Sequence, residues 1–345
     1  MGASNLNESS ARQPAQVGRS WSSPPRRLLR EIPGKLTKPI ILSLLIAIAA
    51  WPSNSAAFQW PDASHYWRVM VNVNQYIENR PREWFAQDKI ITALTILDVK
   101  PGNHSAAIEQ YNKLRRDLAS RGLYVGTYIS GRTVGPASDQ TVYPPGSVPI
   151  EQMPANARYV GSWPGQPDRK IIDVRDPDTR HAFQAGIKEL WVRDPAPIRF
   201  IDNAAVQPAV VRGEPWKAYC DNMEEIRKIA ESQGSRAIFN IAMHVGLSTD
   251  EEARELTEAI GPDNGVALEM PWHPSIQKSP EATAKAVARY RQLLDSGLVV
   301  IMIPTVDTPA STLSDWIRKW KKPTDHLYIS GIFWKAPDLS VYSDR

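Results

Sequence analysis

The chain has 345 residues, 42% of them hydrophobic, 23% charged and 29 of them prolines, which excludes a disordered, collagen-like or coiled-coil polymer and leaves apolar residues for a large core. Its single cysteine, Cys220, excludes an intramolecular disulfide framework and a zinc site built from several thiolates. The formal net charge is +4, but residues 1–57 hold seven basic and two acidic residues, so the near-neutral remainder argues against a nucleic-acid partner.

Residues 1–57 have the order of a secretory signal peptide: a polar and basic start, an uncharged apolar run at 39–52, and small residues up to Ala57. The core of the apolar run is about 12 residues long, shorter than the roughly 20 that a membrane-spanning helix needs. We therefore predict cleavage after Ala57 and export to the periplasm or the extracellular space. An uncleaved signal-anchor, which would tether the protein to a membrane, and a misplaced start codon are the alternatives.

From residue 58 onward, short apolar and β-branched runs alternate with segments of helical spacing. Strands are predicted at 68–73, 91–97, 124–129, 199–202, 237–241, 266–269, 299–303 and 327–332. Helices are predicted at 106–120, 179–191, 216–232, 250–259, 280–296 and 313–321. This order predicts an α/β protein whose residues 58–345 form a single (β/α)8 TIM barrel with buried parallel strands. A doubly wound open sheet is the main alternative.

One segment departs from this alternation. Residues 131–169 are rich in Gly and Pro and show little periodicity, which predicts a long loop insertion after the third strand, followed by an extended piece at 170–174. In a barrel, the loops that follow strands lie on the catalytic face. The insertion is therefore a candidate wall or lid of a substrate cleft, and a tolerated surface insertion is the alternative.

Two carboxylates stand at the ends of predicted strands. Asp202 ends the fourth strand and Glu269 ends the sixth, where a barrel places its catalytic groups. Asp202 alone can be explained as a helix cap or a turn residue, and Glu269 as the partner of a nearby arginine. Glutamate is a poor strand residue, however, and the apolar run before Glu269 draws it toward the barrel mouth.

A pair of carboxylates at a barrel mouth can hydrolyse a glycosidic bond. One must be protonated to help the leaving oxygen depart, and the other must be ionised to attack the anomeric carbon or to activate water. We expect Trp272 to desolvate Glu269 and raise its pKa, whereas Asp202 beside the polar Asn203 remains ionised. The two carboxyl groups should then face one cleft about 5 to 10 Å apart, and their separation decides between retention and inversion.

The sequence also resembles a known group. The stretch at 171–180 (IIDVRDPDTR), the helix that ends at Trp191 and the strand at 199–203 (RFIDN) resemble the D-x-R/S-N/D-P-x-x-R … D-G-x-F-L-D-N stretch of barrel glycoside hydrolases, especially the glycosyl hydrolases near the polygalactosaminidase and α-galactosidase groups. The resemblance implies a barrel hydrolase with Asp202 as nucleophile, Glu269 as general acid/base and Asp173 lining the pocket.

Other polar and aromatic residues at strand ends are expected to complete the cleft by binding sugar hydroxyls or stacking on sugar rings. They are Asn72, Asn203, Asn240, His244, Trp272 and Trp334. Four further tryptophans fall in helical patterns and are predicted to pack against the outside of the barrel. They are Trp191, Trp216, Trp316 and Trp320.

Motifs for other chemistries are absent from the sequence. It has no H-E-x-x-H, no P-loop, no G-x-G-x-x-G and no G-x-S-x-G, so we expect no metal and no cofactor, although a metal held by carboxylates alone stays open. Cys220 lies in a helical pattern and is predicted to be a buried apolar residue. The sequence thus indicates an exported glycoside hydrolase acting on a poly- or oligosaccharide. The alternative is a non-catalytic carbohydrate-binding or scaffold protein on a degenerate barrel.

Overall fold

The computed structural model describes residues 60, 68–71, 91–93, 97–98, 116, 120, 124–136, 142–143, 147–205, 213–241, 248–269, 271–303 and 310–330. All of them belong to one compact unit, Ser55–Arg345. The predicted leader at 1–57 and the predicted site residues Asn72, His244 and Trp334 lie outside the described residues.

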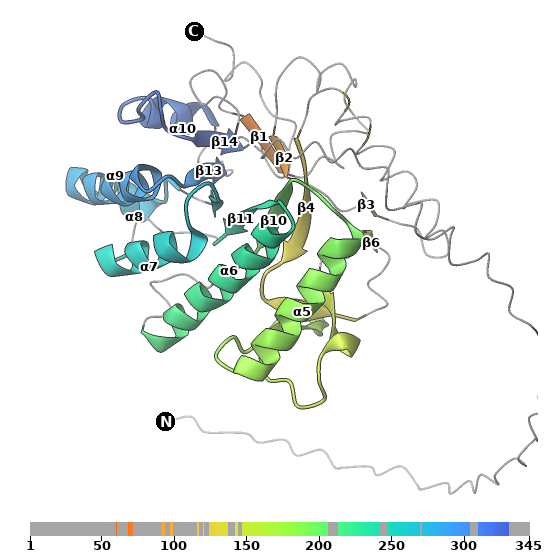
Figure 1. Ribbon diagram of the computed structural model, residues 1–345. Helices are drawn as coiled ribbons and strands as arrows, with labels where there is room; N and C mark the ends of the chain where they lie inside the picture. The colour runs from red at the N-terminus through yellow and green to blue at the C-terminus, as the bar shows by residue number, and fades with distance from the viewer. Residues whose placement is uncertain are drawn as a thin grey trace, which may run out of the picture. The chain divides into compact units, whose positions relative to one another are not determined.

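Eight parallel strands among the described residues form one sheet (Figure 1). They are β1 (Arg68–Val71), β2 (Ile91–Ala93), β4 (Tyr124–Ser130), β10 (Ile198–Asp202), β11 (Arg236–Asn240), β12 (Gly265–Glu269), β13 (Val299–Ile303) and β14 (Leu327–Ser330). They hydrogen-bond in the order β1-β14-β13-β12-β11-β10-β4-β2, and β2 pairs in turn with β1. The sheet therefore closes on itself, and the prediction of an α/β protein with parallel strands is confirmed.

Helices flank this sheet. They are α5 (Pro177–Arg193), α6 (Glu214–Ser232), α7 (Asp250–Ile260), α8 (Pro274–Gln277), α9 (Pro280–Asp295) and α10 (Ala310–Ile317). Four of these described helices, α5, α7, α8 and α9, begin at side-chain caps. Thr249 closes a capping box with Glu252 at the start of α7, and Ser279 accepts a hydrogen bond from Ala282 N at the start of α9. The predicted helix at 106–120 falls almost wholly outside the described residues.

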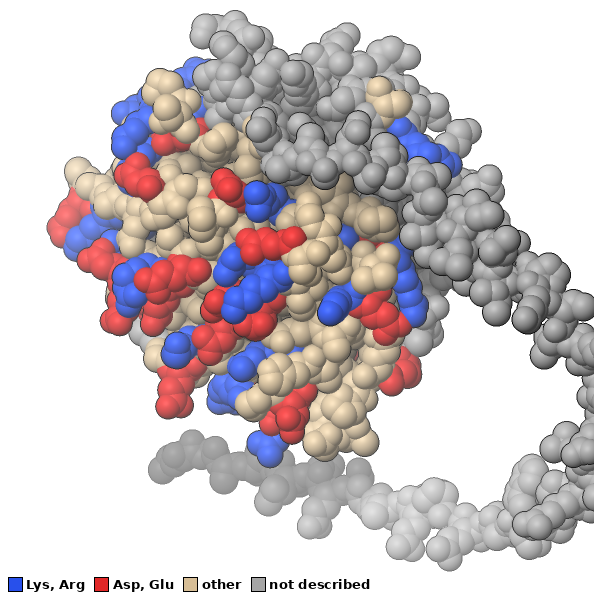
Figure 2. Space-filling view, in the orientation of Figure 1, with Lys and Arg blue, Asp and Glu red and all other residues tan. Residues whose placement is uncertain are grey.

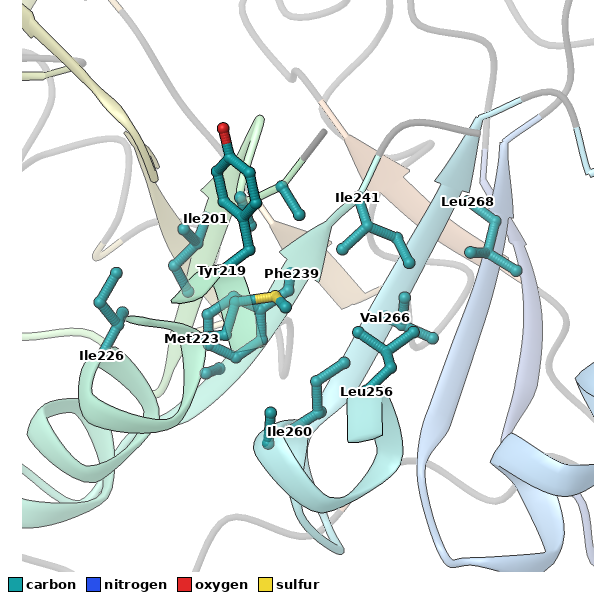
Figure 3. Close-up of a cluster of buried hydrophobic side chains, with 14 of the residues drawn as sticks. Ile201, Tyr219, Met223, Ile226, Phe239, Ile241, Leu256, Ile260, Val266 and Leu268 are labelled. Atoms are coloured by element: carbon teal, nitrogen blue, oxygen red, sulfur yellow. The ribbon is translucent and has the colours of Figure 1, made fainter. Parts of the chain in front are cut away.

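Alternation along the strands divides their side chains between two apolar clusters. Phe200, Ile238 and Ala267 belong to the inner cluster of the barrel, together with Tyr328. The intervening outward side chains join the larger cluster beneath the helices. Figure 3 shows this layer between β10–β12 and the helices α6 and α7: Ile201, Tyr219, Met223, Ile226, Phe239, Ile241, Leu256, Ile260, Val266 and Leu268. Side chains two residues beyond the inner cluster therefore project into the barrel mouth.

The segment predicted as a long loop is a small sheet instead. Residues between 133 and 172 form β5 (Thr133–Gly135), β7 (Val148–Pro149), β8 (Tyr159–Trp163) and β9 (Gln166–Ile172), paired in the order β7-β5-β9-β8. The prediction of a loop was wrong because the Gly and Pro residues of this segment mark turns between short strands. Gly165 makes the tight turn from β8 to β9 with φ +74°, which favours glycine.

This small sheet packs on α5. Val134, Val148 and Ile172 are fully buried and share a cluster with Phe183 of α5. The helix approaches closely because a Cβ on Gly186 would lie only 2.5 Å from Val148 Cγ1. The insertion is thus a rigid addition to the strands' carboxyl-end side after β4, held from behind by a helix.

The outer surface carries interspersed charges. On the face shown in Figure 2, basic and acidic side chains of the described helices alternate. Pairs one helical turn apart account for several of them, among them Lys228 with Glu224, Arg254 with Glu258 and Lys285 with Glu281. Such exposed pairs contribute little stability each. Among the described helices, none is both long and apolar enough to span a membrane.

Trp60, the first described residue, lies against the end of the barrel where the strands begin. Its ring centroid is 6.5 Å from that of Tyr328, a member of the inner cluster, and its Nε1 donates a 2.8 Å hydrogen bond to the carbonyl oxygen of Asp263, just before β12. The residue therefore covers apolar side chains at the end of the barrel remote from the strands' carboxyl termini.

We expect Trp60→Ala to lower the free energy of unfolding by about 2 kcal/mol, since a half-buried indole loses both its packing and a hydrogen bond. Urea titration followed by circular dichroism measures this difference. Val192→Ala, at a side chain that is 67% exposed, is the control and should change the value by less than about 0.5 kcal/mol. Equal effects of the two substitutions would contradict this role of Trp60.

Candidate functional site

Three polar side chains project into the barrel mouth from neighbouring strands. Asp202, Asn240 and Glu269 end β10, β11 and β12, each two residues after an inner apolar side chain. The pairing of Phe200 with Ile238, and of Asn240 with Ala267, sets the three strand ends at similar heights. Alternation and register, both encoded by the apolar pattern of the strands, thus bring these groups together.

Asn240 joins the two carboxylates. Its side-chain Nδ2 donates one hydrogen bond to Asp202 Oδ1 and one to Glu269 Oε1, both at 2.7 Å. An amide nitrogen has two protons, so this atom serves both carboxylates at once. The two oxygens are therefore no further apart than twice 2.7 Å. Asn240 is fully buried, which holds the bridge in place.

Asp202 accepts two further hydrogen bonds. The Tyr128 hydroxyl donates to Asp202 Oδ2 at 2.6 Å, and Asn203 Nδ2 donates to the same oxygen at 2.9 Å. The Tyr128 ring stacks on Phe200 with centroids 6.2 Å apart, and Asn203 adopts a left-handed conformation, φ +52°, that asparagine tolerates. Three donors from β4, β10 and β11 therefore converge on one carboxylate.

Burial raises the pKa of both carboxyl groups, but their surroundings differ. For Asp202, the hydrogen bonds from Tyr128 and Asn240 and the charge of Arg132 oppose the effect of burial on its pKa. For Glu269, burial is again the main cause of the raised pKa, the bond from Asn240 opposes it, and the charge of Asp202 adds to it. Asp202 thus accepts three side-chain hydrogen bonds, and its charge disfavours the ionised form of Glu269.

Tyr128 stays protonated and donates to Asp202 at neutral pH. Burial, followed by the negative charge of Asp202, holds the pKa of the Tyr128 phenol well above its ordinary value. The sequence analysis missed this residue. A tyrosine inside an apolar strand looks like an ordinary core residue, and only its position, two residues before Ser130, which pairs with Asp202, marks it as inward-facing at the mouth.

Two predicted pocket residues have other contacts. Asp173 follows β9 and receives a two-pronged hydrogen bond from Arg175, Nε to Oδ1 at 2.8 Å and Nη2 to Oδ2 at 2.9 Å, which lowers the pKa of Asp173. Trp272 lies with its ring centroid 4.2 Å from that of Trp316, in the layer outside the barrel. The described contacts of both residues are thus with structural neighbours, and neither involves Asp202, Asn240 or Glu269.

The remaining tryptophans behave as predicted. Trp191, Trp216 and Trp316 are buried, and Trp320 packs edge-on to Trp316 with centroids 5.3 Å apart. Cys220 is also buried, in agreement with its prediction, and burial raises the pKa of its thiol. It borders a cavity of about 300 Å³ between α6 and α7. No group of three possible metal ligands is found among the described residues.

A second group of residues escaped the sequence analysis. Arg132 lies two residues after the end of β4, and Arg169 lies on β9. The Arg132 Cζ is 5.7 Å from the centroid of the Trp163 ring on β8. The charge of Arg132 acts on Asp202 and that of Arg169 acts on Tyr128. A segment taken for an irregular loop offers no alternation, so the direction of these side chains was not readable.

Comparisons with known proteins give fold-level likenesses only. No model of a protein family matches the chain, and no curated protein matches it. Among solved structures, it is similar to a variant of the glycoside hydrolase domain of PelA from Pseudomonas aeruginosa, with 15% identity, coverage of 76% of this chain and 94% of that chain, and a TM-score of 0.42. It is also similar to Ega3 of Aspergillus fumigatus in complex with galactosamine, with 10% identity, coverage of 79% of this chain and 94% of that chain, and a TM-score of 0.46.

Endo-glycoceramidase II from a Rhodococcus species gives 11% identity, coverage of 78% and 74%, and a TM-score of 0.41. Of these matched structures, the first is described as a glycoside hydrolase domain and the third as an endo-glycoceramidase. TM-scores of this size and identities of 10 to 15% assign neither a family nor an activity to this chain.

The raised pKa of Glu269 has a consequence for stability. A carboxyl whose pKa is higher in the folded than in the unfolded chain stabilises the fold fully at pH below its unfolded pKa, and this contribution is lost as the pH rises through the folded pKa. We therefore expect Glu269→Gln to raise the Tm at pH 7, where ionisation of Glu269 favours the unfolded wild type over the folded one. The gain should shrink as the pH is lowered toward 4.

Thermal unfolding at a series of pH values measures this difference. Glutamine keeps an oxygen that can accept from Asn240, so the bridge survives the substitution. Asp315→Asn, at an exposed position on α10, is the matched control and should show little change. A Glu269→Gln Tm that is no higher than wild type at pH 7 would contradict the expected effect of burial.

Proposed function

We propose that this protein is a glycoside hydrolase that cleaves a glycosidic bond in a poly- or oligosaccharide with Asp202 as nucleophile and Glu269 as general acid/base. The observation that carries the proposal is the Asn240 bridge, which holds two half-buried carboxylates side by side at the strands' carboxyl ends. Structural carboxylates seldom share a buried site without a cation, because like charges there repel.

The spacing favours a retaining mechanism. Inverting enzymes keep their carboxyl groups about 6.5 to 9.5 Å apart to admit a water, whereas retaining enzymes hold them about 5 to 5.5 Å apart. The nearest oxygens of Asp202 and Glu269 both lie 2.7 Å from Asn240 Nδ2, which supports the shorter separation.

In the first step, Asp202 attacks the anomeric carbon and Glu269 gives its proton to the departing glycosidic oxygen, so a covalent glycosyl ester forms and the leaving sugar departs neutral. In the second step, Glu269 takes a proton from water, whose oxygen displaces Asp202. The donors Tyr128 and Asn203 hold the carboxylate oxygen Oδ2 of Asp202 throughout, which keeps the nucleophile oriented.

We also propose that residues 58–345 complete the (β/α)8 barrel, with 1–57 as a leader that directs export. The closed pairing of the described strands supports the first part. Trp60 supports the division between leader and barrel, because its contacts with Tyr328 and Asp263 begin three residues after the predicted cleavage point. An uncleaved leader would tether the same barrel to a membrane.

We expect Asp202→Asn and Glu269→Gln each to reduce kcat by about a hundredfold to ten-thousandfold on a saccharide that the wild type cleaves. A panel of neutral, acidic and amino polysaccharides, assayed by reducing-end release, identifies the substrate. Asp315→Asn, at an exposed site on α10, is the control and should retain full activity. On a substrate with an activated aryl leaving group, Glu269→Gln should lose less activity than Asp202→Asn, since such a group departs without a proton.

Unchanged activity in both carboxylate variants would overturn the assignment. A wild type that binds saccharides but cleaves none of the panel would instead favour the non-catalytic binding protein. NMR of the first-formed product distinguishes retention from inversion, and an inverted anomer would exclude Asp202 as nucleophile.

The bridge also predicts a pH effect. Asn240 lowers the pKa of both carboxyl groups by bonding to their ionised forms, so its removal should raise both pKa values. For Asn240→Ala we expect the acidic and the basic limbs of the kcat/KM profile to move to higher pH together, with a lower maximum. A lower maximum at unchanged limbs would mean that Asn240 acts only on geometry.

A further inference from the structure

Two arginines near the carboxylate pair have no anionic partner in the part of the chain that the structure describes. No carboxylate of the described residues lies within ion-pair distance of Arg132 or Arg169, although both side chains are half-buried. The Nε of each is buried and has no hydrogen-bond partner there. Buried guanidinium N–H groups normally donate to an acceptor, since a buried donor without a hydrogen bond costs free energy.

The backbone at Gly131 fixes the position of Arg132 relative to Asp202. Gly131 N donates a 2.6 Å hydrogen bond to the carbonyl oxygen of Asp202, and a Cβ on Gly131 would lie 2.6 Å from Ile201 Cγ2. Only glycine lets the chain leave β4 so close to β10, and Arg132 comes next. Its guanidinium lies over the ring of Trp163, which favours a cation at this place.

Arg169 is positioned by the small sheet. Ile172 N donates to the carbonyl oxygen of Arg132 at 3.0 Å, which ties β9 to the segment after β4. Alternation along β9 places Arg169 on the face opposite that of Lys170 and the buried Ile172. Lys170 Nζ donates to Ser162 Oγ at 3.0 Å on that other face, whereas the charge of Arg169 reaches Tyr128 in the barrel mouth.

We propose that Arg132 and Arg169 bind a negatively charged substituent, a carboxylate or a sulfate, on a sugar next to the scissile bond, so that the substrate is an anionic poly- or oligosaccharide. The inference rests on the proposed function, since it places the scissile bond at Asp202 and Glu269. Guanidinium groups match the planar fork of a carboxylate and the oxygens of a sulfate. Without them, an anionic sugar would be repelled by the two carboxylates.

If the two arginines acted only on the ionisation of Asp202, substituting them would give a different experimental result. If the arginines served only to keep Asp202 ionised, their loss would shift the acidic limb of the pH profile and affect neutral and anionic saccharides alike. A ligand-binding role instead predicts a loss confined to anionic saccharides, and a binding constant that weakens as salt is added.

The experiment measures binding to the full chain carrying Asp202→Asn and Glu269→Gln, which prevents turnover. Four probes are titrated calorimetrically: an oligogalacturonate, a sulfated galactan oligosaccharide that carries no carboxylate, a neutral galacto-oligosaccharide and a glucosamine oligomer. We expect the uronate, the sulfated probe or both to bind at least tenfold more tightly than the neutral and cationic probes. Which of the two binds identifies the anionic group.

Matched variants then test the two arginines. In the same background, Arg132→Gln or Arg169→Gln should weaken binding of the anionic probe by about tenfold or more, as expected for loss of a charge-assisted hydrogen bond. Lys170→Gln removes the same charge from the adjacent residue on the other face of β9 and should leave binding unchanged. Arg132→Lys keeps the charge and should recover part of the affinity, which separates binding from misfolding.

Equal or tighter binding of the neutral or cationic probe, binding of none of the four, or a Lys170→Gln loss equal to that of Arg169→Gln would overturn the proposal. The proposed function fails separately. If the wild type cleaves no saccharide while the carboxylate variant still binds an anionic one through the arginines, the anion site stands and the hydrolase assignment falls.

Discussion

The site depends on one amide nitrogen. Asn240 Nδ2 donates both of its protons to carboxylates, and so places two groups that would otherwise repel each other within a common hydrogen-bond network. Burial and the charge of Asp202 both raise the pKa of Glu269, whereas the bond from Asn240 opposes them. We therefore place the proton of the pair on Glu269 and leave Asp202 ionised, which is the starting state that the proposed retaining mechanism requires.

The rest of the structure supplies the conditions for that state. Inner apolar side chains such as Phe200 and Ile238 exclude water below the pair, and the closed strand pairing fixes the heights of the three strand ends. The small sheet after β4 supplies positive charge beside Asp202 without forming an ion pair with it. Stability and chemistry oppose each other here, because the burial that raises the two carboxyl pKa values also costs the folded protein free energy at neutral pH.

Much of this arrangement could be predicted from the sequence, for a physical reason. A buried strand that ends at the barrel mouth has an apolar run followed by a polar residue. From this pattern we predicted that Asp202, Asn240 and Glu269 lie at the mouth. The errors arose where neighbours in sequence are not neighbours in space. Trp272 follows Glu269 by three residues, yet its indole packs on Trp316 of α10. Arg169 lies far from Asp202 in sequence and was hidden in a segment whose strands are too short to show a period.

The three strands that end in Asp202, Asn240 and Glu269 are consecutive in the chain and adjacent in the sheet. Asp202, Asn240 and Glu269 come from β10, β11 and β12, whose pairings are local, whereas the closing contact of Arg68 with Ile329 joins the two ends of the described chain. Local pairings cost less loop entropy than distant ones. The carboxylate pair therefore stands on short-range strand pairings, and none of its three strands takes part in the closing seam between β1 and β14.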